Sequence, residues 1–191
     1  DKLADYLREI RLAGERGHEL VTQMLAFSRG EGAELKRAAL PPLVEQALRM
    51  VRPTLPSSLA LEVAYAPALP EIMTNPVQIQ QIIVNLCINA RDALGGSGAL
   101  RIRVGRGAIS DALCASCHKS FSGDYLVLCL ADDGPGIPPA LRERVFEPLF
   151  STKSGSGGTG MGLAMVHGMV HGQGGHILLH SAPEHGTAFE I

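Results

Sequence analysis

Two side-chain amides stand one turn apart in a stretch whose spacing predicts a helix. Asn85 and Asn89 lie within residues 75–94, in a polar stripe that also contains Asp92 and borders an apolar face. Asparagine is a poor helix former because its side chain competes for backbone hydrogen bonds. A magnesium ion, which needs only one or two protein oxygens beside phosphate and water, would justify that cost. A partly solvated helix flank is the alternative, which the stripe alone favours.

Glycines gather in a loop that leads into another predicted helix, over 161–173. The loop, 154–162, reads Ser-Gly-Ser-Gly-Gly-Thr-Gly-Met-Gly. Free backbone N–H groups at a helix N-terminus bind anions, and Lys153 and Thr159 would add a positive charge and a hydroxyl. The loop is neither a Walker A loop nor a Rossmann fingerprint. It predicts phosphate binding, with a flexible linker as the alternative.

Two adjacent carboxylates follow an apolar strand expected over 125–131. Asp132 and Asp133 are followed by Gly-Pro-Gly, ending at Gly136. Glycine permits tight turns and the close approach of a ligand. A carboxylate at a strand end accepts hydrogen bonds, for example from an exocyclic amine. An ordinary Asp-Gly turn is the alternative.

A Cys-x-x-Cys-His sequence interrupts the stretch between two predicted strands. Haem attachment at this motif requires export and an axial-ligand pocket, which nothing in the sequence suggests. Cys114 and Cys117 would offer zinc two ligands and His118 a third, but no second pair is available, since Cys87 and Cys129 are expected to be buried. We favour a hairpin loop with free or redox-sensitive thiols and keep zinc as the minority interpretation. Four other histidines have no convergent partners that we can assign and are expected to be surface or packing residues: His167, His171, His176 and His180.

The elements that must position these residues are predicted from periodicity and from turn signals. Strands and helices do not alternate strictly, so we expect an α+β fold, a two-layer sandwich with a mixed, mostly antiparallel sheet and helices on one face. The predicted helices cover 43–51, 75–94 and 161–173, and the predicted strands cover 59–65, 100–104, 125–131, 177–181 and 187–191.

One long helix is predicted ahead of this fold, over residues 3–29. Its apolar seam has no partner helix in the chain. The seam either docks on the following domain or forms half of a helical hairpin that dimerises into a four-helix bundle. The pattern alone does not choose between the two.

Composition and net charge exclude several classes of protein function. The chain has 191 residues, of which 46% are hydrophobic, enough for a core. Its net charge of −2 excludes a strongly basic nucleic-acid surface as the main activity. No apolar run approaches the roughly 18 residues of a membrane span, and the first residues do not form a signal peptide. We therefore expect reduced cysteines and a cytoplasmic domain, with membrane anchoring of the parent protein left open.

Taken together, these motifs resemble the catalytic, ATP-binding domain of bacterial sensor histidine kinases, in the gyrase, chaperone, kinase and mismatch-repair ATPase superfamily. The boxes of that family occur in order, and the resemblance covers about 34–191. They are Gln81–Ala90 for the N box, Asp132–Gly136 for the first glycine box, Val145–Lys153 for the F box, Gly158–Leu163 for the second glycine box and Gly186-Thr187 in the last hairpin.

The resemblance implies a Bergerat-type ATP fold and a role for each matched residue. Asn89 would coordinate the Mg²⁺ that bridges the ATP phosphates, Asp132 would bind the adenine amine, and residues 151–162 would form a mobile lid. ATP-hydrolysing relatives carry a glutamate where this chain has Asn85, and an amide cannot act as a general base. The full set of implied ATP-binding residues is Asn85, Asn89, Asp92, Asp132, Gly134, Gly136, Ile137, Phe150, Thr152, Lys153, Gly158, Thr159, Gly160, Met161, Gly162, Leu163 and Thr187.

The resemblance also implies a domain plan and partners. Residues 1–30 would be the second helix of the dimerisation and phosphotransfer hairpin, 31–42 a linker and 43–191 the kinase domain. The phosphoacceptor histidine would precede Asp1, because His18 lies on what resembles the second helix. The expected partners are ATP, a second copy through the first helix, and a response regulator receiver domain, but no nucleic acid. An ATP hydrolase and a degenerate interaction module remain as alternatives.

Overall fold

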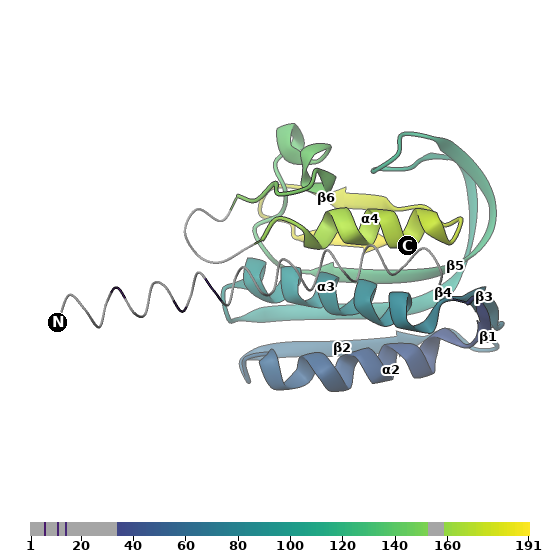
Figure 1. Ribbon diagram of the computed structural model, residues 1–191, viewed down its shortest axis with the longest axis horizontal. Helices are drawn as coiled ribbons and strands as arrows, with labels where there is room; N and C mark the ends of the chain where they lie inside the picture. The colour runs from purple at the N-terminus through teal and green to yellow at the C-terminus, as the bar shows by residue number, and fades with distance from the viewer. Residues whose placement is uncertain (1–5, 7–10, 12–13, 15–33, 153–158) are drawn as a thin grey trace.

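The computed structural model describes residues 6, 11, 14, 34–152 and 159–191 (Figure 1). Tyr6, Arg11 and Gly14 are helical, within the helix predicted over 3–29; the rest of that prediction, His18 included, lies outside the described residues. No helix in the described ranges is long and apolar enough to cross a membrane.

A mixed sheet forms one layer of the fold. Over the described ranges it has five strands in the order β2-β4-β5-β7-β6, with β2 parallel to β4 and the other pairs antiparallel. The bounds are β2 Leu59–Tyr65, β4 Gly98–Leu113, β5 Ser120–Asp132, β6 Leu178–Ser181 and β7 Thr187–Glu190. The predicted α+β class and mixed sheet are confirmed.

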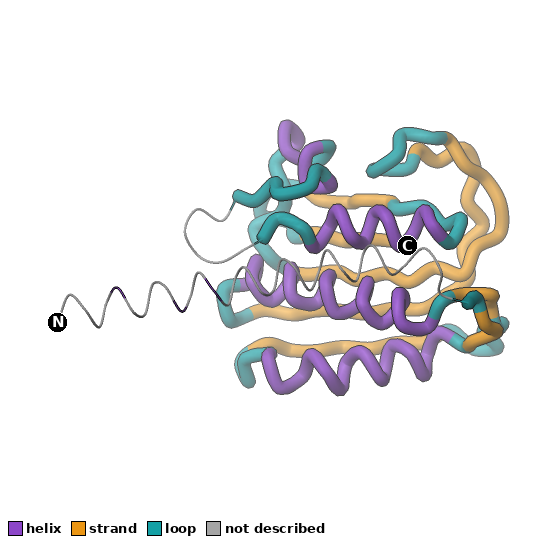
Figure 2. Tube along the Cα trace, in the orientation of Figure 1, coloured by secondary structure: helices purple, strands orange, loops and turns teal. Residues whose placement is uncertain are grey.

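Helices form the second layer and cover one face of the sheet (Figures 1 and 2). They are α2 (Leu40–Val51), α3 (Pro76–Leu94) and α4 (Gly162–Gly172), with α3 packed between the other two. The apolar face of α3 supplies Ile82 and Ile83, which are fully buried in the core with Leu100 and Ile102 of β4. Each such side chain contributes about 1.5–3 kcal/mol by leaving water, which fixes α3 against the sheet.

The start of α3 is held by side-chain caps. Asn75 Oδ1 accepts hydrogen bonds from the N–H groups of Val77 (3.1 Å) and Gln78 (3.3 Å). Gln173, just after α4, accepts at Oε1 from the Asn75 N–H at 2.8 Å. The helix ends at Gly95, whose φ of 61° is the left-handed conformation common at helix C-termini. These caps fix where the amide stripe of α3 begins and ends.

Several short elements were not predicted. β1 (Lys36–Ala38), inside the expected linker 31–42, pairs with β3 (Ile72–Thr74) in a separate two-stranded sheet. Within the described ranges three short 3₁₀ turns also occur, η2 at Arg52–Thr54, η3 at Pro139–Leu141 and η4 at Arg144–Phe146.

The hairpin of β4 and β5 extends well beyond the two strands predicted at 100–104 and 125–131. A long curved pair reaches away from the sheet (Figure 1), and residues 114–119 form its turn. The prediction of a hairpin loop around Cys114 and Cys117 is therefore confirmed.

Candidate functional site

A cleft of about 330 Å³ opens between α3 and the turn that follows β5. One wall is apolar, and polar groups converge on it from separate elements. It is lined by Leu86, Asn89, Ala90, Asp92, Ala93, Leu100, Leu130, Asp132, Pro135, Gly136, Ile137, Thr152, Leu163, Thr187 and Phe189. A concave apolar pocket with a few convergent polar groups is the usual form of a small-molecule site.

The amide pair of α3 faces the start of α4. A Cβ on Gly162, the first residue of α4, would lie 3.6 Å from both Asn85 Oδ1 and Asn89 Nδ2. The Nδ2 atom of Asn85 is buried and finds no hydrogen-bond partner among the described residues. A buried donor without an acceptor costs about 1–3 kcal/mol, so this geometry favours a ligand over the solvated-flank alternative.

Asp132 and Asp133 are adjacent in sequence but point to different surroundings. Asp132 lines the cleft and accepts at Oδ1 from the Gly134 N–H at 2.8 Å. Burial raises the pKa of Asp132, and the donated hydrogen bond only partly offsets this. Asp133 instead pairs with Arg101, at 2.5 Å, and this partner lowers its pKa. Of these two aspartates, only Asp132 can therefore bind a ligand in the cleft.

Closely packed backbone segments form the floor of the cleft beside Asp132. Gly136 has φ +73°, and a Cβ there would overlap the carbonyl of Ala182. Gly186, at φ +77°, would similarly overlap the carbonyl of Asp132. Only glycine fits these two contacts, which bring the β6–β7 hairpin against the turn after β5.

Ser181 connects the two segments of that floor, the turn after β5 and the β6–β7 hairpin. The sequence analysis did not predict this role. Its Oγ accepts from the Ile137 N–H at 2.8 Å, donates to the Gly186 carbonyl at 2.9 Å and lies 2.9 Å from Thr187 Oγ1. Ile137 and Thr187 both line the cleft. A lone serine in a hairpin carries no sequence signal of this role, because the contact spans 44 residues.

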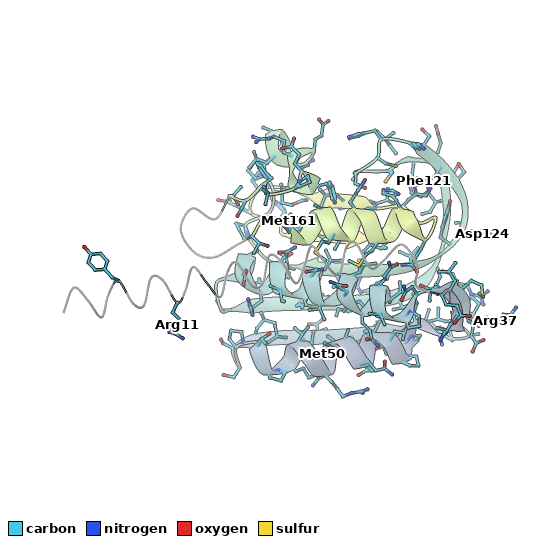
Figure 3. All side chains as sticks on the ribbon, in the orientation of Figure 1. Arg11, Arg37, Met50, Phe121, Asp124 and Met161 are labelled. Carbon is cyan, nitrogen blue, oxygen red and sulfur yellow. The ribbon has the colours of Figure 1, made fainter. Side chains whose placement is uncertain are left out.

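The described end of the glycine loop, residues 159–162, packs against the segment that precedes the loop. Gly160 has φ +67°, and a Cβ there would overlap the backbone of Leu149. The Met161 N–H donates to Thr159 Oγ1 at 3.4 Å, and Met161 lies at the start of α4 (Figure 3). The ring of Phe150 packs under the Arg144 guanidinium, 4.4 Å from its centroid.

The implied site residues therefore divide into four sets. Asn89, Asp92, Asp132, Gly136, Ile137, Thr152, Leu163 and Thr187 line the cleft. Asn85, Gly134 and Gly162 contact lining residues, whereas Phe150, Thr159, Gly160 and Met161 are not among the described lining residues. Lys153 and Gly158 lie outside the described residues.

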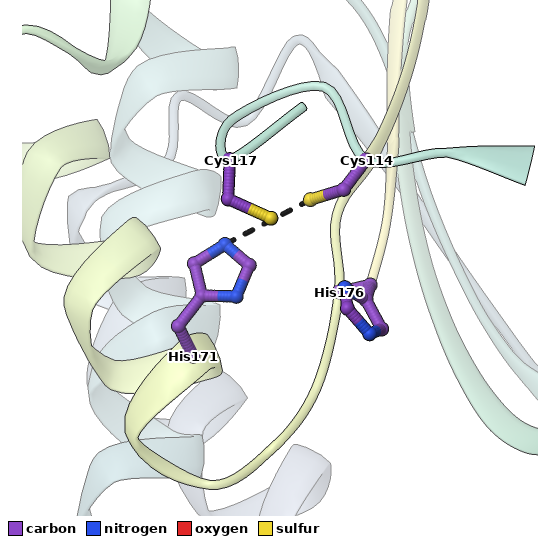
Figure 4. Close-up of side chains that lie close together, drawn as sticks. All are labelled: Cys114, Cys117, His171 and His176. Atoms are coloured by element: carbon purple, nitrogen blue, oxygen red, sulfur yellow. Dashed lines mark hydrogen bonds between the residues drawn. The ribbon is translucent and has the colours of Figure 1, made fainter. Parts of the chain in front are cut away.

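A second group of side chains converges at the far end of α4, and it corrects the sequence analysis. His171 and His176 were expected to have no convergent partners, yet they meet Cys114 and Cys117 (Figure 4). His118, expected as the third zinc ligand, is not in the group that the described residues form. The expectation was wrong because convergence across more than 50 residues leaves no mark in local spacing.

Comparisons with known proteins agree with this geometry. A family model described as histidine kinase-, DNA gyrase B-, and HSP90-like ATPase matches residues 74–191. The chain is 31% identical to the sensor kinase CckA of Brucella abortus over 97% of this chain and 20% of that protein. It is 30% identical to the sensory histidine kinase/phosphatase NtrB of Salmonella typhimurium over 99% of this chain and 52% of that protein.

Solved structures share the fold. The mycobacterial sensor histidine kinase MprB is similar at a TM-score of 0.62 and 25% identity, over 82% of this chain and 95% of that one. Full-length ShkA, solved in complex with AMPPNP, is similar at a TM-score of 0.74 and 23% identity, over 100% of this chain and 38% of that one. The chain spans about half or less of the length of the curated relatives named above.

Proposed function

The chain belongs to the family of histidine kinase-, DNA gyrase B-, and HSP90-like ATPases, and from that premise we propose that its cleft binds ATP with Mg²⁺ for transfer of the γ-phosphate to a histidine. The observation that carries the proposal is the convergence of Asn89, Asp132 and Thr187 from three separate elements on one cleft. Its relatives are sensor kinases.

The purine end of the proposed site lies at Asp132. Its carboxylate accepts a hydrogen bond from the adenine amine, and Thr187 lies beside it on the neighbouring strand. The apolar wall formed by Leu100, Leu130 and Phe189 covers the faces of the base. The absence of a Cβ at Gly136 lets the floor pack closely under the purine.

The phosphate end lies where α3 meets the start of α4. The oxygen of the Asn89 amide there is a hard ligand of the kind that Mg²⁺ prefers. The carboxylate of Asp92 lies beside it and pairs with the Arg91 guanidinium at 2.7 Å. When bound, Mg²⁺ neutralises charge on the phosphates. Asn85 Nδ2, buried without a described partner, donates to a phosphate oxygen, and the N-terminal N–H groups of α4 add an anion site. Thr159, Gly160 and Met161, within the lid expected over 151–162, lead into this helix.

The amide of Asn85 favours transfer of the γ-phosphate over hydrolysis of ATP. A hydrolase needs a base to activate water, and a neutral amide cannot take that proton. The site therefore positions the γ-phosphate and shields its charge, which supplies most of the rate in phosphoryl transfer. Measurable steady-state phosphate release would instead favour the hydrolase alternative. A cleft that stays empty in saturating ATP would favour a degenerate interaction module.

The remaining roles concern the parent protein. We propose that residues 1–30 are the second helix of a dimerisation and phosphotransfer hairpin and that the phosphoacceptor histidine belongs to the first hairpin helix. The linker expected over 31–42 ends earlier, because β1 and the start of α2 at Leu40 already pack within the ATP-binding unit expected over 43–191. The phosphoryl group then passes to an aspartate of a response regulator. The matches to sensor kinases over nearly the whole chain support this division.

The adjacent aspartates supply a matched test. Titration with AMPPNP and Mg²⁺ is expected to show saturable binding for the wild-type chain and for Asp133→Asn, which removes only an exposed ion pair. Asp132→Asn is expected to abolish binding, because the amide presents a donor or a misplaced acceptor to the purine. Equal affinity in all three proteins would contradict the assignment of Asp132.

A further inference from the structure

The strongest unassigned feature is the cluster of Cys114, Cys117, His171 and His176. One ligand atom from each side chain lies within 4.8 Å of the others, and it is the only such group found among the described residues. The cysteines come from the β4–β5 turn, His171 from the last turn of α4, and His176 from the segment before β6 (Figure 4). The four side chains thus tie together three separate segments.

The ligand set and its spacing match one metal. Two thiolates and two imidazoles form a tetrahedral Zn²⁺ site, in which bonds of about 2.3 Å to sulfur and 2.0–2.1 Å to nitrogen place the ligand atoms roughly 3.3–3.8 Å apart. Cys114 Sγ already lies 3.7 Å from His171 Nε2. Closing the cluster around an ion needs only small side-chain movements from the 4.8 Å limit.

The cysteine loop is shaped to hold a thiolate. The N–H of Ile177 donates to Cys114 Sγ at 3.4 Å, and the N–H groups of Ser116 and Cys117 add to it. The hydroxyl of Ser116 lies 3.6 Å from the same sulfur. His118, at φ +57°, closes the loop by donating its N–H to the Cys114 carbonyl at 3.0 Å. His118 therefore shapes the turn rather than serving as a ligand.

The histidines are held in place before any ion arrives. The His176 ring stacks on Phe121, with centroids 4.1 Å apart and planes at 13°. Its Nδ1 is buried with no hydrogen-bond partner among the described residues. His171 Nε2 lies 2.9 Å from the hydroxyl of Ser116, inside the cysteine loop. Stacking on Phe121 thus holds the His176 ring, and the Ser116 contact places His171 Nε2 at the cluster, where an ion would replace the hydroxyl as its partner.

We propose that Cys114, Cys117, His171 and His176 bind a structural Zn²⁺ ion that clips the β4–β5 turn to the C-terminal end of α4. Four protein ligands leave no open position, so the ion holds structure and performs no chemistry. Two thiolates balance its charge, and their protons leave to solvent on binding. Because α4 also carries Leu163 of the cleft, the clip anchors the helix that contributes to the proposed ATP site.

The test uses the whole chain, purified under reducing conditions, with elemental analysis and Co²⁺ as a spectroscopic probe. We expect about one zinc per chain, and Co²⁺ substitution that gives thiolate charge-transfer bands and the intense visible bands of a tetrahedral site. A strong zinc chelator is expected to lower the Tm of the chain by several degrees.

Variants sharpen the assignment. Cys117→Ser and His171→Ala are expected to reduce bound zinc about tenfold or more. The matched controls Cys129→Ser and His180→Ala, whose side chains lie outside the cluster, are expected to keep it. The wild-type Co²⁺ spectrum does not depend on any variant folding. The proposal is overturned if the reduced wild-type chain binds neither Zn²⁺ nor Co²⁺, if Co²⁺ binds without thiolate bands, or if Cys114 and Cys117 form a disulfide in place of a metal site.

Discussion

The two ends of α4 carry different kinds of site. At its N-terminal end, Gly162 and Leu163 meet the amides of α3 and the cleft. At its C-terminal end, His171 joins a thiol and imidazole cluster. The cleft is built from contiguous motifs and keeps open space for a ligand. The cluster is built from residues far apart in the chain, and its ligand atoms lie within 4.8 Å of one another. One helix thus links a proposed reaction site to a proposed anchor.

The largest expected effect is on nucleotide binding, and it tests whether the cleft and the zinc cluster act independently. Asp132→Asn should weaken nucleotide binding by about 100-fold or more, because a charged acceptor in a buried site is lost, while zinc content stays unchanged. Cys117→Ser should remove zinc while saturable binding of AMPPNP remains. Calorimetry and elemental analysis on both variants make the comparison. Loss of both properties in both variants would show that the two ends form one site.

The next effect concerns the floor of the cleft. Gly136→Ala places a Cβ against the Ala182 carbonyl at a positive φ, and we expect a loss of about 3 kcal/mol or more in the free energy of unfolding. Gly105→Ala is the matched control, since its Cβ would meet nothing within 4 Å. Urea denaturation of both variants measures the difference. Equal midpoints would mean that the floor is not packed as described.

A smaller effect is expected for the serine that bridges the floor. Ser181→Ala removes the acceptor of the Ile137 N–H and the donor to the Gly186 carbonyl. The expected cost is about 1–3 kcal/mol in unfolding free energy, together with weaker AMPPNP binding. Ser110→Ala, at an exposed position of β4, is the control. If Ser181→Ala matched that control in both measurements, Ser181 would have no positioning role.

The smallest expected effect is on the pH dependence of folding stability, to which Asp132 and Asp133 contribute in opposite directions. The pKa of Asp132 is raised on folding, so its contribution to stability is present below its unfolded pKa and is lost as pH rises through the folded value. The pKa of Asp133 is lowered, so its contribution is present above its unfolded pKa and is lost as pH falls through the folded value.

Unfolding of the nucleotide-free chain around the ordinary aspartate pKa of about 3.9 should therefore reveal opposite trends. Asp132→Asn is expected to stabilise the chain slightly at neutral pH, where the buried charge is removed. Asp133→Asn is expected to cost under about 1 kcal/mol there, because its ion pair is solvent-exposed. The same pH dependence in both variants would contradict the assigned environments.

Local sequence patterns predicted the bounds of several helices and strands. The strand at 59–65 was predicted with the bounds of β2, and the helix over 75–94 differs from α3 by one residue, because periodicity and capping residues are local signals. The cleft residues Asn89, Asp132 and Thr187 came from the family resemblance, which rests on contiguous motifs.

What sequence reasoning missed depends on contacts between distant segments. The β4–β5 strands extend beyond their apolar cores because pairing continues through polar positions such as Arg106 and Asp124. Ser181 acts through Ile137, and His171 and His176 reach Cys114 only after the sheet and α4 have packed. Such convergence is a property of the folded chain.

The most direct test of the central claim is a crystal structure of the chain with AMPPNP and Mg²⁺. We expect nucleotide in the cleft, with the adenine amine within hydrogen-bond distance of Asp132 and the metal bound by Asn89. A cleft closed by protein side chains under saturating nucleotide, or a nucleotide bound elsewhere, would contradict it.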